Sequence, residues 1–271
     1  MHNPPLIGKR LFLLDMDGTI YLDEQVFDGT VDFLRYVREI GGKYLFLTNN
    51  SSRSVSAYIE KMHRLGIATE KDDFLTSVDA LILYLNSNGY REKRLYAFGT
   101  ASFREQLSDA GFRITDQLRD DVQALVCGFD TELTFRKLED ACILLNRGVD
   151  FIAANPDWVC PTWYGYVPDC GSVCEMLFRA TGRHPRFIGK PQPEMALLAM
   201  ERYGFSKKET LLIGDRVYTD IACGIAGGVD TCVLFTGEAQ PKDLTTTKFP
   251  PTYAFATVRD LLLNCQSPAA K

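Results

Sequence analysis

Short apolar runs alternate with longer segments of helical periodicity along most of this chain, and this alternation constrains the fold more than any other feature. Leu11–Leu14 and Tyr44–Leu47 are two such runs, and residues 31–40 between them have helical spacing. Near the other end, 210–213 and 231–235 flank another helical stretch. Strand–helix–strand units of this length require right-handed crossovers, so we predict a parallel sheet with helices on both faces.

The middle of the chain, from about residue 88 to 186, repeats this alternation, with strand-like runs at 94–98 and 124–127 among others. It could simply continue the same sheet. However, polar residues that follow strands on either side of it are expected to form one site, which is easiest if the middle is an insertion. We therefore predict an α/β protein with a Rossmann-like core formed by residues 1–87 and 187–271 and an inserted α/β domain at 88–186.

The overall charge argues against partners that recognise cations. Thirty Lys and Arg residues against thirty-five Asp and Glu residues give a formal net charge of -5, which offers no electrostatic footprint for nucleic acid or an anionic membrane surface. No apolar stretch approaches membrane-spanning length, and Met1–Arg10 lacks the pattern of a secretory leader. We therefore expect a soluble, cytoplasmic protein that binds neither nucleic acid nor membrane.

The eight cysteines lie mainly inside apolar runs, between Cys127 and Cys265. In a chain with no export signal, buried reduced thiols are the better interpretation. Cys170 and Cys174 would lie one helical turn apart, which raises the question of a metal. No second pair or nearby histidine completes a zinc site, so packing is favoured for both.

Two carboxylates, Asp15 and Asp17, follow directly after the first apolar run. Placed at a strand end with no basic neighbour in sequence, they are costly unless a cation or a reaction uses them. An acidic turn that caps a helix would explain one of them, but not the whole pattern.

Three further strand or loop ends carry polar residues. Thr48 and Asn49 could offer neutral donors to a phosphate oxygen, although Ser51 and Ser52 beside them would also serve as helix caps. Lys190 lies between Gly189 and Pro191, where a solvated lysine is the ordinary alternative. Asp215, with Thr219 and Asp220, repeats the first arrangement of a buried run followed by carboxylates, and Asp220 could be a helix cap.

Taken in chain order, these segments strongly resemble the four motifs of the haloacid dehalogenase (HAD) superfamily. Asp15-Met16-Asp17-Gly18-Thr19 matches the first motif in full, Thr48 the second, Lys190 the third, and Asp215 with Asp220 the fourth. The resemblance covers nearly the whole chain, because the insertion falls where subfamily IIA, which includes NagD and the p-nitrophenylphosphatases, carries its cap. It implies a Rossmann-like HAD core with an inserted C2a-type α/β cap.

The cap itself carries a signature of that subfamily, in the segments 155–157, 167–172 and 180–183. One departure is Asp169, where many relatives carry glycine, and it leaves the catalytic set untouched. The cap aromatics expected near a leaving group, or alternatively in the cap core, are Trp158, Trp163, Tyr164 and Tyr166.

The resemblance implies a phosphatase mechanism with Asp15 as nucleophile, forming an aspartyl-phosphate, and Asp17 as general acid and base. It also implies Mg²⁺, held by Asp15, Asp215 and the backbone carbonyl of Asp17; hard oxygen ligands and only three histidines favour magnesium over zinc. Asp220 would orient Lys190 or a metal-bound water through hydrogen bonds. The residues implied to bind substrate are Thr48, Asn49, Lys190, Arg216 and Thr219.

The expected substrate is a small-molecule phosphate monoester, such as a sugar phosphate or a nucleoside monophosphate, with p-nitrophenyl phosphate as an artificial one. The subfamily also allows a homodimer. Three alternatives stay open: a HAD phosphotransferase or mutase, a receiver-like signalling protein, and a non-catalytic phosphate-binding protein. Mutases usually carry their cap between the first two motifs, receivers are far shorter, and the intact acidic set argues against a silent binder.

Overall fold

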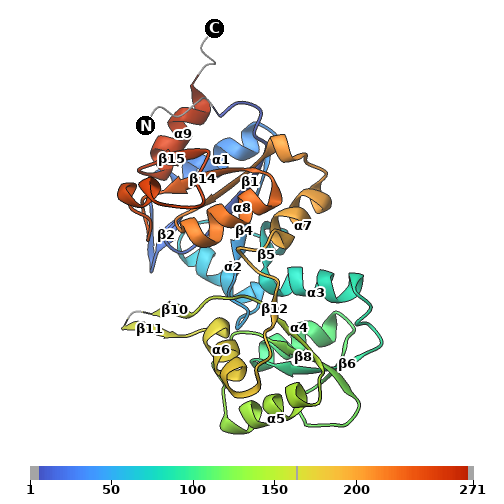
Figure 1. Ribbon diagram of the computed structural model, residues 1–271. Coiled ribbons are helices and arrows are strands. Elements are labelled where there is room, and N and C mark those ends of the chain that lie inside the picture. Colours follow the sequence, from blue (N-terminus) through green and yellow to red (C-terminus); the bar gives the residue numbers. More distant parts are fainter. Residues whose placement is uncertain (1–5, 163, 268–271) are drawn as a thin grey trace. The chain divides into compact units, whose positions relative to one another are not determined.

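A computed structural model describes residues 6–162 and 164–267 of the chain (Figure 1). The chain divides into two compact units, one of residues 1–48, 59–75 and 190–271, the core unit, and one of residues 49–58 and 76–189, the cap unit. The core unit stops 12 residues before the boundary expected at 87, the cap unit ends 3 residues after the one expected at 186, and residues 49–58 are counted in the cap unit. The expected boundaries stay a proposal. No helix within the described ranges is long and apolar enough to cross a membrane.

The core unit is built on a six-stranded sheet with the order β15-β14-β13-β1-β4-β5. Its strands from β15 to β4 are parallel, as the alternation of strand and helix predicts. The strands are β1 (Leu11–Asp15), β4 (Lys43–Thr48), β5 (Phe74–Thr76), β13 (Thr210–Gly214), β14 (Asp230–Leu234) and β15 (Tyr253–Phe255). Because the chain leaves β1 for β4 on one side and later returns as β13 on the other, β1 marks the point where ligands bind in open α/β sheets.

Amphipathic helices cover this sheet. α1 packs against α9 and α7 against α8, and the apolar side of each helix is buried. α9 begins with a capping box in which Thr257 and Asp260 satisfy each other's backbone N–H groups. The helices are α1 (Thr30–Glu39), α2 (Val55–Arg64), α7 (Glu194–Tyr203), α8 (Ala222–Gly227) and α9 (Val258–Gln266), and α2 begins in the cap unit and ends in the core unit.

The cap unit has its own parallel sheet, with the order β12-β9-β8-β6-β7. α3 packs on α4 and α5 on α6. The elements are α3 (Ser77–Ser87), β6 (Arg94–Phe98), α4 (Ala101–Asp109), β7 (Arg113–Thr115), β8 (Val122–Cys127), α5 (Phe135–Asn146), β9 (Asp150–Ala153), α6 (Cys170–Thr181) and β12 (Arg186–Phe187). The expected mixed α/β class with parallel sheets is therefore confirmed.

Two antiparallel hairpins lie outside the parallel sheets. β2 (Tyr21–Leu22) pairs with β3 (Gln25–Val26) in the core unit, and β10 (Val159–Thr162) pairs with β11 (Gly165–Pro168) in the cap unit. In the cap unit, the chain passes from β9 through this second hairpin before it reaches α6. Asp169, the departure from the family pattern, is the N-cap of α6 and accepts the N–H of Cys170.

The cysteine pair packs in the cap core. Cys170 and Cys174 lie on α6 with their sulfur atoms 4.0 Å apart, and both are buried in an apolar cluster that also contains Cys127. All eight cysteines are free thiols. Burial raises the pKa of Cys127, so this thiol is a poor nucleophile.

Candidate active site

The register of the core sheet brings the first and fourth motifs together. Leu47 pairs with Asp15 on β1, and Leu14 pairs with Ile213 on β13, so Thr48, the last residue of β4, and Asp215, just beyond the end of β13, both lie next to Asp15. The carboxyl ends of parallel strands share one edge of a sheet. Carboxylate oxygens of Asp15, Asp215 and Asp220 consequently lie within 4.8 Å of one another.

Lys190 is the cation of this cluster. Its ammonium donates to Asp15 Oδ1 at 2.5 Å and to Asp220 Oδ1 at 2.7 Å, and its side chain is only 4% exposed. Asp220 is itself fixed, because its other oxygen accepts the backbone N–H of Arg216 at 3.1 Å. The lysine is therefore a buried, doubly paired group rather than a solvated surface residue.

Backbone groups hold the second carboxylate in place. Asp215 Oδ2 accepts the N–H of Glu238 at 2.8 Å, and the Thr19 hydroxyl lies 3.4 Å from its other oxygen. Gly18 has a φ of +86°, and a Cβ atom there would lie 2.6 Å from Asp215 Oδ2. Glycine is therefore required after Asp17 both for the left-handed backbone and for the approach of Asp215.

The cluster has more negative charge than its surroundings balance. Burial raises the pKa of Asp215, and the carboxylates of Asp15 and Asp220 raise it further. Burial also raises the pKa of Asp220, although Lys190 opposes this. Burial lowers the pKa of Lys190, but Asp15 and Asp220 outweigh it and leave that pKa raised. The ammonium of Lys190 thus pairs with two of the three carboxylates, and Arg216 lowers the pKa of the third, Asp215. The pKa values of Asp215 and Asp220 stay raised all the same.

This arrangement fits a divalent cation. All the donors are oxygens, which are the ligands of hard ions such as Mg²⁺. A cation would also offset the charge that raises the pKa of Asp215. Lys190 and the backbone N–H of Arg216 occupy both oxygens of Asp220, whereas Lys190 occupies only one oxygen of Asp15. Asp15 and Asp215 are therefore the carboxylates best placed to bind the cation.

Comparison with known proteins gives the family. Residues 12–113 match a model of haloacid dehalogenase-like hydrolases, and residues 187–261 match a model described as HAD-hydrolase-like. An acid sugar phosphatase of Staphylococcus epidermidis is 32% identical over 91% of this chain and 94% of its own. The chain belongs to the haloacid dehalogenase-like hydrolases.

Solved structures of HAD phosphatases share the whole fold. The 4-nitrophenylphosphatase of Thermotoga maritima has a TM-score of 0.90 and 33% identity, covering 96% of this chain and 98% of its own. A glycerol phosphate phosphatase of Mycobacterium tuberculosis, in complex with magnesium, has a TM-score of 0.88 and 30% identity, covering 96% of this chain and 78% of its own. The chain is therefore a NagD-like HAD hydrolase of the phosphatase class, with a Rossmann-like core and a cap.

The remaining predicted site residues of this HAD hydrolase have varied surroundings. Thr48 is buried at the end of β4. Asn49 is counted in the cap unit, where its amide donates to the carboxylate of Asp157 at 3.1 and 3.2 Å. Arg216 forms an ion pair with Glu238 at 3.1 Å, and Thr219 is buried in a single π-helical turn, 217–221. The substrate-binding roles of these residues stay predictions.

Asp17 has partners that sequence analysis missed. Lys61 Nζ lies 3.4 Å from its Oδ1, and the Tyr21 hydroxyl donates to its Oδ2 at 3.3 Å. Burial raises the pKa of Asp17, the charge of Lys61 lowers it, and Asp15 raises it. Nothing in the local sequence singles out Lys61, because a lone lysine on an amphipathic helix ordinarily faces solvent.

The cap aromatics are exposed where the structure describes them. Trp158, Tyr164 and Tyr166 have exposed fractions of 59%, 64% and 71%. Placement in the cap core, one of the two alternatives for these residues, is therefore wrong for these three. Trp163 lies outside the described residues.

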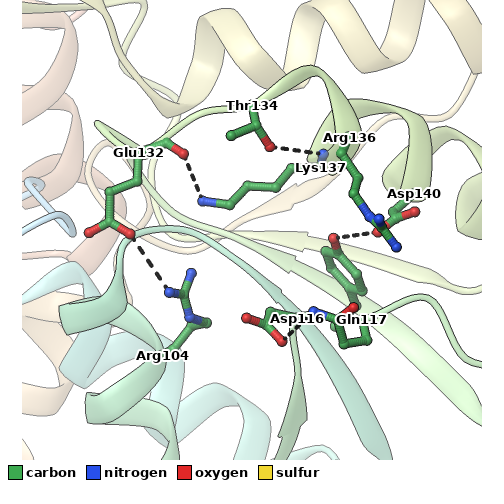
Figure 2. A pocket seen from close by; sticks show the side chains of 9 residues that line it. Arg104, Asp116, Gln117, Glu132, Thr134, Arg136, Lys137 and Asp140 are labelled. Atoms are coloured by element: carbon green, nitrogen blue, oxygen red, sulfur yellow. Dashed lines mark hydrogen bonds and ion pairs between the residues drawn. The ribbon is translucent and has the colours of Figure 1, made fainter.

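The cap unit has a polar hollow of its own, with a volume of about 240 Å³ (Figure 2). Arg104 pairs with Glu132 at 3.7 Å, and Tyr96 donates to the buried carboxylate of Asp140 at 3.1 Å. Three basic and three acidic side chains contribute to its lining, so their formal charges cancel. The lining residues are Tyr96, Arg104, Asp116, Gln117, Glu132, Thr134, Arg136, Lys137 and Asp140.

Proposed function

We propose that this HAD hydrolase is a magnesium-dependent phosphatase that hydrolyses small-molecule phosphate monoesters through a phosphorylated Asp15. The observation that carries the proposal is the buried ion pair between Asp15 and Lys190 inside an acidic cluster at the end of β1. A carboxylate kept ionised by an ammonium is an adequate nucleophile toward a phosphoryl group whose charge is neutralised.

The reaction has two steps. In the first, an oxygen of Asp15 attacks phosphorus, the bond from phosphorus to the ester oxygen breaks, and Asp17 gives its proton to the departing alkoxide. In the second, Asp17 takes a proton from water while the water oxygen attacks phosphorus, and the bond from phosphorus to the Asp15 oxygen breaks. This releases inorganic phosphate and restores the Asp15 carboxylate. General acid and base catalysis of this kind contributes on the order of a hundredfold or more.

Residues around Asp15 hold the phosphoryl group as its charge spreads. Lys190 and Thr48 lie at neighbouring strand or loop ends, and they would hold its oxygens by charge and by a hydroxyl donor. Arg216 and Thr219 would line the phosphate side of the site. Asn49 completes the set proposed to bind substrate, and Asp220 orients Lys190 through the ion pair at 2.7 Å.

Mg²⁺ is the proposed metal, held by Asp15, Asp215 and the backbone carbonyl of Asp17. When bound there, it neutralises charge on the phosphoryl group and on the carboxylates. The magnesium complex of the glycerol phosphate phosphatase, 30% identical to this chain, supports the choice.

The relatives support a small-molecule substrate. Their descriptions name sugar phosphate, nitrophenyl phosphate and glycerol phosphate as what those enzymes act on. A phosphotransferase or mutase would use the same first step but pass the phosphoryl group to another hydroxyl. We propose transfer to water, with no nucleic acid or membrane partner and with a homodimer as the assembly.

The test is a panel of p-nitrophenyl phosphate, sugar phosphates, nucleoside monophosphates and glycerol phosphate, assayed for released phosphate with Mg²⁺ and with EDTA. We expect turnover of several esters with Mg²⁺, none with EDTA, and ¹⁸O from labelled water in the released phosphate. Turnover that EDTA does not affect would exclude the metal, and transfer of phosphate to an added alcohol in preference to water would favour the phosphotransferase. If no ester were turned over with Mg²⁺ present, the result would favour a non-catalytic phosphate-binding protein.

A further inference from the structure

We propose that Lys61 is the positioning residue for the proton donor, Asp17, and that it matters most for substrates with poor leaving groups. The inference rests on the proposed function, because it assigns a partner to the residue that protonates the departing oxygen. All the residues involved belong to the core unit.

Lys61 contacts Asp17 directly and also through the side chain of Tyr21. Its ammonium lies 3.4 Å from Asp17 Oδ1 and 3.9 Å from the centre of the Tyr21 ring. The Tyr21 hydroxyl donates to Asp17 Oδ2 at 3.3 Å. Each oxygen of the Asp17 carboxylate therefore has its own partner, and the two partners contact each other through a cation–π interaction.

The backbone beneath this arrangement is fixed as well. Gly18 donates its N–H to the carbonyl of Tyr21 at 2.8 Å, and the Tyr21 side chain is fully buried. The loop after Asp17 thus holds the tyrosine, and the tyrosine holds both the carboxylate and the ammonium. Asp17 has a side chain 52% exposed, so without these partners several rotamers would be open to it.

The ordinary alternative for Lys61 is a solvated lysine on α2. Its side chain is only 21% exposed, against the high exposure typical of such residues. Among the described residues, the carboxylate within ion-pair distance of Lys61 is that of Asp17. Ordering a lysine side chain costs conformational entropy, so a fixed lysine beside a proposed proton donor calls for a compensating role.

Geometry, rather than charge alone, is what Lys61 supplies. A proton donor works only within hydrogen-bond reach of the atom it protonates. A carboxylate held at both oxygens is kept from rotating away from the space beside Asp15, where the leaving oxygen would be. Good leaving groups need little protonation, so they should depend little on this restraint, whereas alkoxides should depend on it strongly.

The test compares kcat/KM for p-nitrophenyl phosphate, which has a good leaving group, with that for glycerol phosphate, which has a poor one. For Lys61→Met, which removes the charge but keeps the stem, we expect a loss of about tenfold or more with glycerol phosphate and less than about threefold with p-nitrophenyl phosphate. Lys61→Arg should restore most of the loss, and Tyr21→Phe should show the same selectivity more weakly. Arg64→Met, an exposed residue on the same helix, is the matched control and should change neither value.

Because kcat/KM reports only the steps up to leaving-group departure, hydrolysis of the intermediate does not mask the effect. Equal losses on both substrates, or no loss on either, overturn the proposal. Thermal melts of all variants check folding, and if Lys61→Met does not fold, Tyr21→Phe decides alone by the same ratio. The wild-type enzyme measured alongside tests the proposed function separately, since it must turn over both esters whatever Lys61 does.

Discussion

The core and cap units both carry a buried carboxylate just beyond a parallel strand, yet they balance its charge differently. In the cap, Asp130 follows β8 with no side-chain exposure, and Lys137 neutralises it at 2.7 Å. In the core, the ammonium of Lys190 pairs with both Asp15 and Asp220, and Asp215 adds a third carboxylate to the same cluster. An architecture of parallel strands and helices therefore does not create a reactive site by itself. The excess of negative charge in the core distinguishes the site from a structural ion pair.

The largest difference between the two units is expected in kcat/KM when the same Asp→Asn substitution is made at Asp15 in the core and at Asp130 in the cap. We expect Asp15→Asn to lower kcat/KM by about 10⁴-fold or more, because the amide cannot form the acyl phosphate. Asp130→Asn should leave kcat/KM within about threefold. Phosphate release from p-nitrophenyl phosphate measures both.

The unfolding free energy should respond in the opposite order, with the larger loss in Asp130→Asn. Asp130→Asn leaves Lys137, only 16% exposed, without its carboxylate and should lower the unfolding free energy by about 3 kcal/mol. Asp15→Asn should remain folded with a similar unfolding free energy, since Lys190 keeps Asp220. If Asp130→Asn abolished activity in a folded protein, the contrast between the units would fail.

The next largest difference is expected in kcat/KM when Lys190 in the core and Lys137 in the cap are each replaced by methionine. Lys190→Met should lower kcat/KM by about 10³-fold, because it removes a charge that holds the phosphoryl group and keeps Asp15 ionised. Lys137→Met should change kcat/KM by less than about threefold. Comparable losses in the two variants would show that charge balance does not mark the site.

The acidic cluster also predicts how stability depends on pH. Burial and the neighbouring carboxylates raise the pKa of Asp215 from its ordinary value of 3.8 to about 7 in the folded protein. Between these two pH values the native state therefore binds more protons than the unfolded state. This group therefore lowers the unfolding free energy as pH rises through that window, by about 1.4 kcal/mol for each pH unit in metal-free enzyme.

Denaturant titrations at pH 5 and pH 8 in EDTA check this dependence. Asp215→Asn should lose this contribution and show a weaker decline towards pH 8. Added Mg²⁺ should stabilise the wild type more at pH 8 than at pH 5, because protons compete with the metal. The same stabilisation by Mg²⁺ at both pH values would contradict this account.

The smallest effect concerns the cap hollow. Tyr96→Phe removes the hydrogen bond to Asp140 and should lower the unfolding free energy by about 1 kcal/mol without changing kcat/KM for p-nitrophenyl phosphate. Thermal denaturation and the phosphatase assay measure the two quantities. A change in kcat/KM would mean that this hollow, balanced in charge, takes part in function.

Sequence predicted the parts of this enzyme that follow from local pattern. Buried runs such as Leu11–Leu14 gave the central strands, and residues after them gave the acidic cluster with Lys190. Patterns of two or three residues were too short to indicate β12 or the β2–β3 hairpin.

Long-range pairings were beyond sequence reasoning. Lys61 pairs with Asp17 across 44 positions in sequence, and Glu238, in the loop after β14, donates its backbone N–H to Asp215 across 23 positions. Asn49 looks like a phosphate donor in sequence, but Asp157, 108 positions away, accepts its amide. Such pairings depend on where the chain returns in space, which residue type and periodicity do not encode.

The place of β1 between β4 and β13 has a consequence for synthesis on the ribosome. β4 emerges soon after β1, but β13 begins at Thr210, so one edge of β1 stays open while more than half of the polypeptide is translated. An open apolar edge strand is a template for aggregation. Nascent chains of this enzyme should therefore need protection, by a chaperone or by early burial under helices, until the last quarter of the chain is released.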